Sequence, residues 1–137
     1  MIGYVTFVMD GRVLAGRLGE VREVVRATGI EALDGARAPV TGLLVLRGTP
    51  VPVVDLRMAT DPGDTGDVLV LEGPDGALGL AVDKVLAVLA PDALTPTQVR
   101  PGAGLPAYVL EVRRDASGAP LFVVSLAALA GLLPTPS

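Results

Sequence analysis

Few residues of this chain have side chains that could catalyse a reaction. Histidine and cysteine are both absent, which removes the commonest general base, thiolate metal sites and the nucleophile pairs that depend on either residue. Carboxylates remain, and Asp55 and Asp83 each follow an apolar, strand-like run. A solvent-facing strand end explains each of them without chemistry. We therefore expect no enzyme, no metal and no cofactor, with a carboxylate-dependent enzyme on a β-barrel as the least favoured alternative.

Two further motifs imitate ligand sites. The segment "GRVLAGRL", residues 11–18, has the glycine spacing of a phosphate loop, but Arg17 and Leu18 stand where that loop needs Lys and Ser or Thr. The run Asp61, Asp64 and Asp67 lacks the terminal glutamate and the flanking helices of a calcium-binding EF-hand. We interpret the first as part of a hairpin and the second as a solvated loop.

One arginine is more informative, in the stretch "GLLVLRGTPVPVVDLR" at residues 42–57. Apolar runs on both sides of Arg47-Gly48 predict a β-hairpin with the arginine at its tip, where it is poorly placed to stabilise a core. Pro50 and Pro52 lack the backbone N–H, and residues two apart donate to the same side of a strand, so pairing should be weakened on one side. That side is predicted to be a sheet edge or a bulge.

Turn signals predict many more short strands. Asp10-Gly11, residues 73–76 and residues 115–118 each separate two apolar runs, which predicts three further hairpins. The segment Val21–Arg26 fits a half-buried strand or one helical turn. Elsewhere we expect a strand at 85–89, a long irregular connection over 91–106 and a short helix over 126–133. The total of nine or ten strands predicts an all-β fold, as a sandwich or a pair of small barrels.

The length and charge of the chain restrict its function further. Its 137 residues predict a single domain over 1–137, with a connection between two lobes in the turn-rich segment near 58–67. The formal net charge of −4 argues against nucleic-acid binding, which needs a basic surface. The nearly uncharged stretch 121–133 is shorter than the ~20 residues of a membrane span. We expect a cytoplasmic protein without direct membrane insertion.

Taken together, these segments resemble one family, the CheW-like domain of bacterial chemotaxis signalling. The resemblance covers nearly the whole chain: the first hairpin, "VREV" at 21–24, Pro39, the stretch 42–57, "LGLAVDKVLAV" at 78–88, and the closing strand and helix. It implies two five-stranded SH3-like β-barrels with a core between them, a short C-terminal helix and no catalysis. It also implies an adaptor that contacts the cytoplasmic hairpin tip of a chemoreceptor and the regulatory domain of the histidine kinase CheA.

The resemblance assigns roles to nine positions. Those expected to contact the receptor, or to support that contact, are Val21, Glu23, Thr41 and Arg47. Those expected to belong to the structural motif are Gly42, Gly48, Pro52, Asp55 and Arg57. Asp55 and Arg57 are two apart on one strand face, so they could also pair with each other or with neighbours to hold the turn.

The sequence also departs from the family's pattern. Val45 stands in place of an asparagine, Thr41 where a basic residue is common in some members, and Pro50 is an extra proline. Residues Leu110-Glu111 replace a glycine, and Ser125 stands where Asp is frequent. These departures leave open an alternative, a divergent CheW-like scaffold that binds another signalling protein, for example in a surface-motility pathway.

Overall fold

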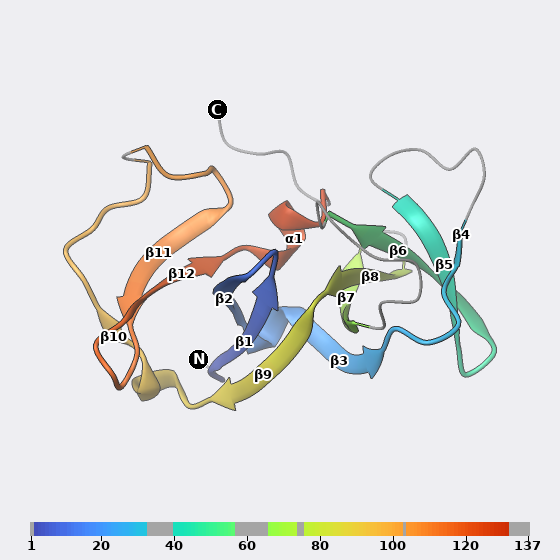
Figure 1. Ribbon diagram of the computed structural model, residues 1–137, viewed down its shortest axis with the longest axis horizontal. Helices are drawn as coiled ribbons and strands as arrows, with labels where there is room; N and C mark the ends of the chain where they lie inside the picture. The colour runs from blue at the N-terminus through green and yellow to red at the C-terminus, as the bar shows by residue number, and fades with distance from the viewer. Residues whose placement is uncertain (1, 33–39, 57–65, 74–75, 103, 132–137) are drawn as a thin grey trace.

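The computed structural model of the protein describes residues 2–32, 40–56, 66–73, 76–102 and 104–131. Within these ranges the chain forms two six-stranded sheets that lie side by side, with a short helix above their junction (Figure 1). None of the helices in these ranges is both long and apolar enough to cross a membrane. The predicted all-β fold with a short C-terminal helix is confirmed.

The first sheet, sheet A, has the strand order β10-β11-β12-β2-β1-β9. Its strands are β1 (Tyr4–Met9), β2 (Arg12–Arg17), β9 (Lys84–Leu89), β10 (Thr95–Pro96), β11 (Val109–Arg114) and β12 (Pro120–Val124). Neighbouring strands are antiparallel except for β12 and β2, which are parallel.

The second sheet, sheet B, has the order β3-β7-β8-β6-β5-β4. Its strands are β3 (Val21–Arg26), β4 (Glu31–Ala32), β5 (Val40–Leu46), β6 (Thr49–Asp55), β7 (Asp67–Gly73) and β8 (Gly76–Val82). Here β6 and β8 form the parallel pair. The segment 21–26, which fitted either a strand or a helical turn, is a strand. The strand count exceeds the predicted nine or ten because β4 and β10 have two residues each.

The hairpins form where the turn residues predict them. In the turns Asp10-Gly11 and Arg47-Gly48 all four residues have positive φ, at 52°, 76°, 49° and 80°. Left-handed backbone at both central positions is the type I′ geometry, whose twist matches that of the flanking strands. The hairpins β1–β2, β5–β6, β7–β8 and β11–β12 are therefore confirmed.

The chain changes sheet at two points. It passes from β2 to β3 through the 3₁₀ turn η1 (Leu18–Glu20), and it returns from β8 to β9 at Asp83. The predicted connection between lobes near 58–67 is corrected by this topology, because β6 and β7, on either side of it, belong to the same sheet. Loop composition marks a break between strands but carries no information about which sheet each strand joins.

Three apolar clusters follow from this arrangement. The largest draws on both sheets, with Phe7 and Leu14 from sheet A and Leu69 and Leu80 from sheet B. A second lies in sheet A, around the fully buried Tyr4, and a third in sheet B contains Leu44, Val53 and Ala81. A core between two lobes matches the expectation, while the closing of each sheet into a barrel stays a prediction.

The prolines in β6 lie where the strand has a neighbour on one side only. The strand lies between β5 and β8 rather than at an edge. However, β8 pairs with it over Val53–Asp55, beyond Pro52, so the proline-bearing part has β5 as its ladder partner. The predicted unpaired side is therefore present along Pro50 and Pro52, although β6 as a whole is a central strand because β8 pairs with its other end.

The helix is shorter than the sequence suggests, whereas the connection before β11 has the predicted irregular form. Helix α1 spans Leu126–Leu129, and residues 132–133 of the predicted helix lie outside the described ranges. The connection 91–106 is mostly irregular, as predicted, and contains the 3₁₀ turn η2 (Pro91–Ala93) and β10.

Candidate partner-binding site

Two of the four positions expected to contact a receptor meet in the structure. Arg47 at the tip of the β5–β6 hairpin donates from Nη1 to Oε2 of Glu23 over 3.1 Å and from Nη2 to Oε1 of the same carboxylate. This bidentate pairing fixes the guanidinium both in distance and in orientation. The partner of Arg47 is therefore Glu23 on β3.

The pair joins parts of sheet B that are far apart in the strand order. Strands β7 and β8 stand between β3 and the hairpin that carries Arg47, so the contact requires a curled sheet. Beneath it lies a pocket of about 250 Å³. The residues lining this pocket come from β3, the β5–β6 hairpin, β7 and β8: Arg22, Glu23, Leu46, Arg47, Thr49, Val51, Val70 and Ala77.

The backbone at Arg47 is unusual for an arginine. Its φ of 49° lies in the left-handed region, and the type I′ turn favours Asn, Asp or Gly at this position. A non-glycine residue held there carries strain, which is a feature that clusters at functional positions. Turn propensity therefore does not explain why an arginine stands here. The explanation must lie in the role of its side chain.

Both charges of the pair are kept at neutral pH. The hydrogen bond from Arg47 lowers the pKa of Glu23 below its ordinary 4.5, and the same bond raises the pKa of Arg47. The Arg47 side chain is 68% exposed and that of Glu23 is 25% exposed. Ion pairs this close to solvent contribute little to folding stability, so the pair serves orientation more than stability.

The other two receptor positions have separate surroundings. Val21 is half-buried, packs against the cluster shared by both sheets and lines a pocket of about 310 Å³ beside η1, β7 and α1. Thr41 falls at a bulge in β5, between Val40 and Gly42. Its side chain lies outside the described part of the chain.

The structure explains why two positions of the structural motif are glycines. A Cβ on Gly42 would lie 2.7 Å from Cγ2 of Ile30 and 2.9 Å from the carbonyl oxygen of Glu31, so glycine lets β4 approach β5. Gly48 supplies the second left-handed position of the turn. These are the two positions of the motif where a side chain would be costly.

The rest of the motif lies along β6. Pro52 is half-buried opposite Leu43, and Asp55 ends the strand opposite Ala81 of β8. Arg57 is outside the described residues, and so is any pairing of it with Asp55.

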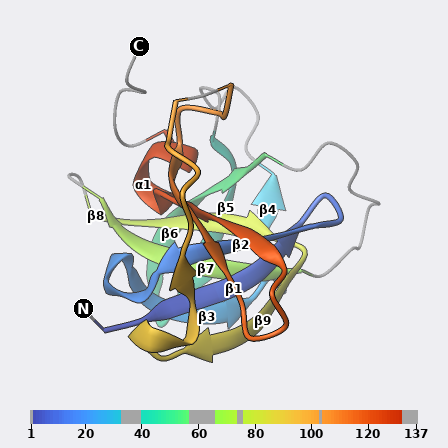
Figure 2. The same ribbon diagram turned by 90° about the vertical axis from the view of Figure 1, so that its left-hand side faces the viewer.

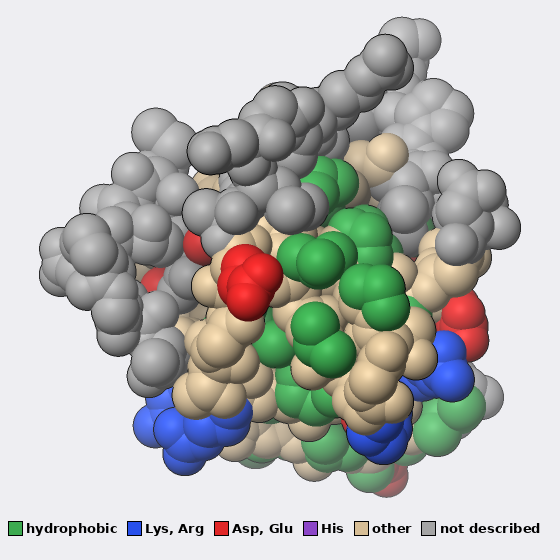
Figure 3. Space-filling model, turned by 90° about the vertical axis from the view of Figure 1, so that its right-hand side faces the viewer, with side chains coloured by type: hydrophobic (Ala, Val, Ile, Leu, Met, Phe, Trp, Pro, Cys, Tyr) green, Lys and Arg blue, Asp and Glu red, His purple; other side chains and the backbone are tan. Residues whose placement is uncertain are grey.

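Two departures from the family pattern turn out to face each other. Val45 lies directly opposite Pro50 in the β5–β6 hairpin, and Val45 is 60% exposed. The next pair on this face is Leu43 with Pro52, so the outer surface of the hairpin is apolar along these two pairs. Figure 3 shows hydrophobic side chains gathered in the middle of the face on which β4 to β6 lie, with basic side chains along its lower edge. The sequence showed that Val45 and Pro50 each depart from the family pattern. Only the register of the β5–β6 hairpin shows that they face each other.

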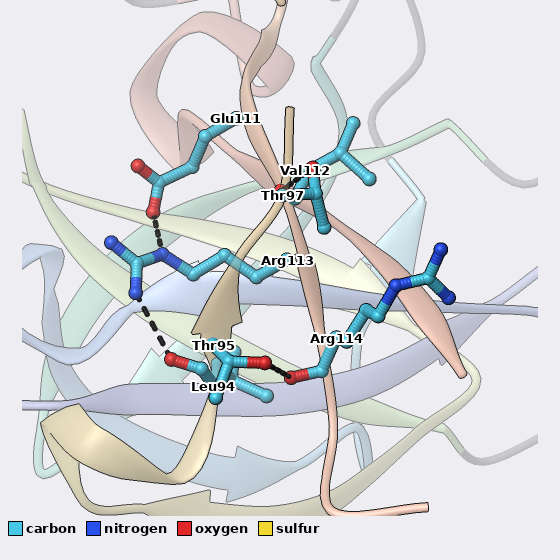
Figure 4. A network of polar contacts seen from close by, with 7 residues as sticks. All are labelled: Leu94, Thr95, Thr97, Glu111, Val112, Arg113 and Arg114. Atoms are coloured by element: carbon cyan, nitrogen blue, oxygen red, sulfur yellow. Dashed lines mark hydrogen bonds and ion pairs between the residues drawn. The ribbon is translucent and has the colours of Figure 1, made fainter. Parts of the chain in front are cut away.

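Two further departures have structural partners. Ser125 accepts a hydrogen bond at Oγ from the backbone N–H of Ala128 over 3.1 Å, so it caps α1 as an Asp would. Glu111 forms an ion pair with Arg113, whose Nη1 also donates to the carbonyl oxygen of Leu94 over 3.0 Å (Figure 4). This network ties the connection 91–106 to β11.

Comparison with known proteins assigns the family. The family model of the CheW-like domain matches residues 3–133, and the chain therefore belongs to the CheW-like domain family. This is a family of scaffolding proteins rather than enzymes. Within the described ranges, no group of three or more acidic side chains is arranged to hold a metal ion.

Two individual proteins illustrate the relationship. The chemotaxis protein CheW of Treponema pallidum (strain Nichols) is 30% identical over 112 residues, which are 73% of this chain and 66% of that protein, just under two thirds of its length. The crystal structure of the scaffolding protein TtCheW from Thermoanaerobacter tengcongensis matches with a TM-score of 0.71 at 22% identity, over 92% of this chain and 90% of that one. The structural likeness shows that the two chains share a fold.

Proposed function

We propose that this protein is a cytoplasmic adaptor that couples chemoreceptors to the histidine kinase CheA in chemotaxis signalling. Membership of the CheW-like family and the similarity to a chemotaxis CheW support this proposal. The observation that carries it is the contact of Glu23 with Arg47, because the resemblance assigns both positions to the receptor surface.

The geometry of the pair suits recognition of another protein. Glu23 engages two of the five N–H donors of the guanidinium, while the Arg47 side chain remains 68% exposed. A side chain that is already oriented loses less conformational entropy on binding. Arg47 is thus prepared to read carboxylates or carbonyl groups on the tip of a receptor's helical hairpin.

A second candidate function follows from the apolar pair Val45 and Pro50. Their exposure places apolar surface where the family pattern has an asparagine. It favours a CheW-like scaffold whose partner offers an apolar contact there, such as a signalling protein of a surface-motility pathway. The two candidates differ in their partner and in the face of the hairpin that it contacts, because Arg47 lines a pocket on one face while Val45 and Pro50 lie on the other.

Binding to a receptor's cytoplasmic hairpin fragment, measured by calorimetry, tests the first candidate. We expect Arg47→Glu to weaken binding by roughly thirtyfold or more, as removal of an interface hot spot does. This variant also places two carboxylates together, so its melting temperature should fall by a few degrees. The double variant Glu23→Arg/Arg47→Glu restores the pair with its charges exchanged, so it should recover the melting temperature without recovering receptor binding.

Arg12→Glu is the matched control, because Arg12 is an exposed arginine next to the β1–β2 turn in the other sheet. It should bind the receptor fragment as the unaltered protein does. Recovery of receptor binding in the double variant would show that Arg47 serves the fold alone. Failure of the unaltered protein to bind any receptor fragment from the same genome would favour the second candidate.

A further inference from the structure

Glu20 makes a long-range contact that neither the family resemblance nor the turn chemistry explains. It is the last residue of η1, directly before Val21 at the start of β3. Its Oε2 accepts a hydrogen bond from the backbone N–H of Leu126 over 3.2 Å, and its Oε1 accepts one from Ala127 over 3.3 Å. One carboxylate therefore ties the crossing between the sheets to the first two residues of α1.

Helix α1 depends on such outside support. It has four residues, far fewer than an isolated helix needs, and the first N–H groups of any helix lack partners within it. Ser125 accepts from Ala128, while Glu20 accepts from the two N–H groups that precede it. Together they satisfy the start of the helix, and two of these three hydrogen bonds go to a residue more than 100 positions away.

The same helix also packs against the strand before the crossing. Leu126 is 0% exposed, and a Cβ on Gly16 of β2 would lie 2.7 Å from its Cδ1. Gly16 thus leaves the space that Leu126 fills. Helix α1 lies above the junction of the sheets (Figures 1 and 2). It contacts Gly16 of β2, which precedes η1, and Glu20, which ends η1. We call these contacts of Glu20 with Leu126 and Ala127 the Glu20 clasp.

Besides the Glu20 clasp, the beginning of the strand that follows is held by one neighbouring strand, by the packing of Val21 on the shared cluster and by an ion pair of Arg22 with Glu72 of β7. β3 is the end strand of sheet B, and its ladder with β7 is interrupted by a bulge between Val21 and Glu23. A strand with a single neighbour and an interrupted ladder takes its direction partly from the residues before it. Glu20 is the residue before it, and Glu23 three positions later holds Arg47.

We propose that Glu20 is a positioning residue, which holds the start of β3 through α1 so that Glu23 presents Arg47 to the receptor. The effect on receptor binding rests on the proposed function, whereas the effect on β3 does not. The clasp acts through backbone groups, so it requires a carboxylate at position 20 and a helix at 126–129 but no particular side chain on Ala127.

Hydrogen exchange and binding, measured on the same variants, test the proposal. Glu20→Ala should speed amide exchange about tenfold at residues 126–127 and also at 21–23, because local opening becomes easier. Receptor affinity should fall about tenfold at a temperature where the variant is fully folded, while affinity for the CheA regulatory domain stays the same. Glu20→Gln keeps one acceptor oxygen and should show the same pattern more weakly.

Two further variants separate the clasp from general effects. Ser125→Ala removes the cap on Ala128 without touching Glu20, so it should loosen 126–127 and, to a smaller extent, 21–23. Asp92→Asn removes an exposed negative charge in η2 and should change none of these quantities.

The outcomes distinguish the proposal from its alternatives. If Glu20→Ala loosens 126–127 but leaves exchange at 21–23 and receptor affinity unchanged, Glu20 merely caps the helix and the proposal is overturned. Equal losses of receptor and CheA affinity would also overturn it, since they indicate general destabilisation. If the unaltered protein binds no receptor fragment, the proposed function fails, and exchange at 21–23 alone decides whether the clasp positions β3. Should Glu20→Ala fail to fold, Glu20→Gln provides the same comparison.

Discussion

Arg47 shows how far inference from a single residue can go. Apolar runs around Arg47-Gly48 indicated a hairpin tip, and a charged side chain at a tip indicated a partner. Its actual contact, Glu23, lies 24 residues away, and no local pattern connects the two. We expected the Arg47 side chain to be available to a partner, and the structure shows that Glu23 already holds it. The informative experiment is therefore an exchange of both charges rather than a single substitution.

Tyr4 offers a test of residue energetics in the core of sheet A. Its side chain is 0% exposed, and in the described part of the chain its hydroxyl is buried without a hydrogen-bond partner. Burial raises the pKa of this hydroxyl above its ordinary value of 10.0, and the nearby Arg113 opposes the shift. Since an unpaired buried hydroxyl is costly, Tyr4→Phe should leave the free energy of unfolding unchanged or raise it by up to about 1 kcal/mol.

Urea denaturation of the two proteins measures this difference. Tyr4→Ala is the control, because it also removes the ring and should cost about 3–5 kcal/mol as other large-to-small core changes do. A loss of more than about 1 kcal/mol in Tyr4→Phe would show that the hydroxyl has a partner in solution, with Glu111 the first to examine because its carboxylate also raises this pKa.

At the scale of elements, turn residues were sufficient to predict the hairpins, but they did not predict which distant strands pair. Asp10-Gly11 and Arg47-Gly48 each determine a two-residue turn, so the boundaries of β1, β2, β5 and β6 followed from a few neighbouring residues. The parallel pairs β12–β2 and β6–β8 bring together strands distant in sequence, and turn residues say nothing about them. For the same reason the prolines of β6 predicted a side without a ladder partner but did not predict that β8 pairs with the strand beyond them.

The edges of the sheets carry a prediction about the kinase. β9 ends sheet A, and its Leu86 and Val88 are 47% and 63% exposed. An exposed apolar edge is suited to pairing with another sheet, whereas proline-bearing backbone cannot extend a ladder. We propose that the CheA regulatory domain binds along β9, and that its main chain does not pair with residues 50 and 52.

Val88→Lys should therefore weaken binding of the CheA regulatory domain about tenfold or more while leaving the melting temperature nearly unchanged. Val99→Lys is the matched control, because Val99 is 50% exposed in the connection 91–106. Surface plasmon resonance on both variants decides the matter. Equal effects of the two substitutions, or a complex whose main chain pairs through residues 50 and 52, would refute the assignment.

At the scale of the whole molecule, the sequence predicted two lobes and misplaced their connection. The turn-rich segment near 58–67 lies between two strands of sheet B, while the real crossings are η1 and Asp83. η1 is three residues long and has one glycine and no proline, so its composition did not mark it as a crossing. The Glu20 clasp escaped prediction for a related reason, since its two ends are more than 100 residues apart.

The central claim is that this CheW-like chain connects a receptor to a kinase without turnover of its own. The direct measurement is autophosphorylation of CheA with receptor-containing membranes from the same genome, in the presence and absence of this protein. We expect the protein alone to show no activity, and its addition to bring the kinase under receptor control, so that the kinase rate changes and responds to attractant. A kinase rate in the presence of receptor that is the same with and without the protein would contradict the account.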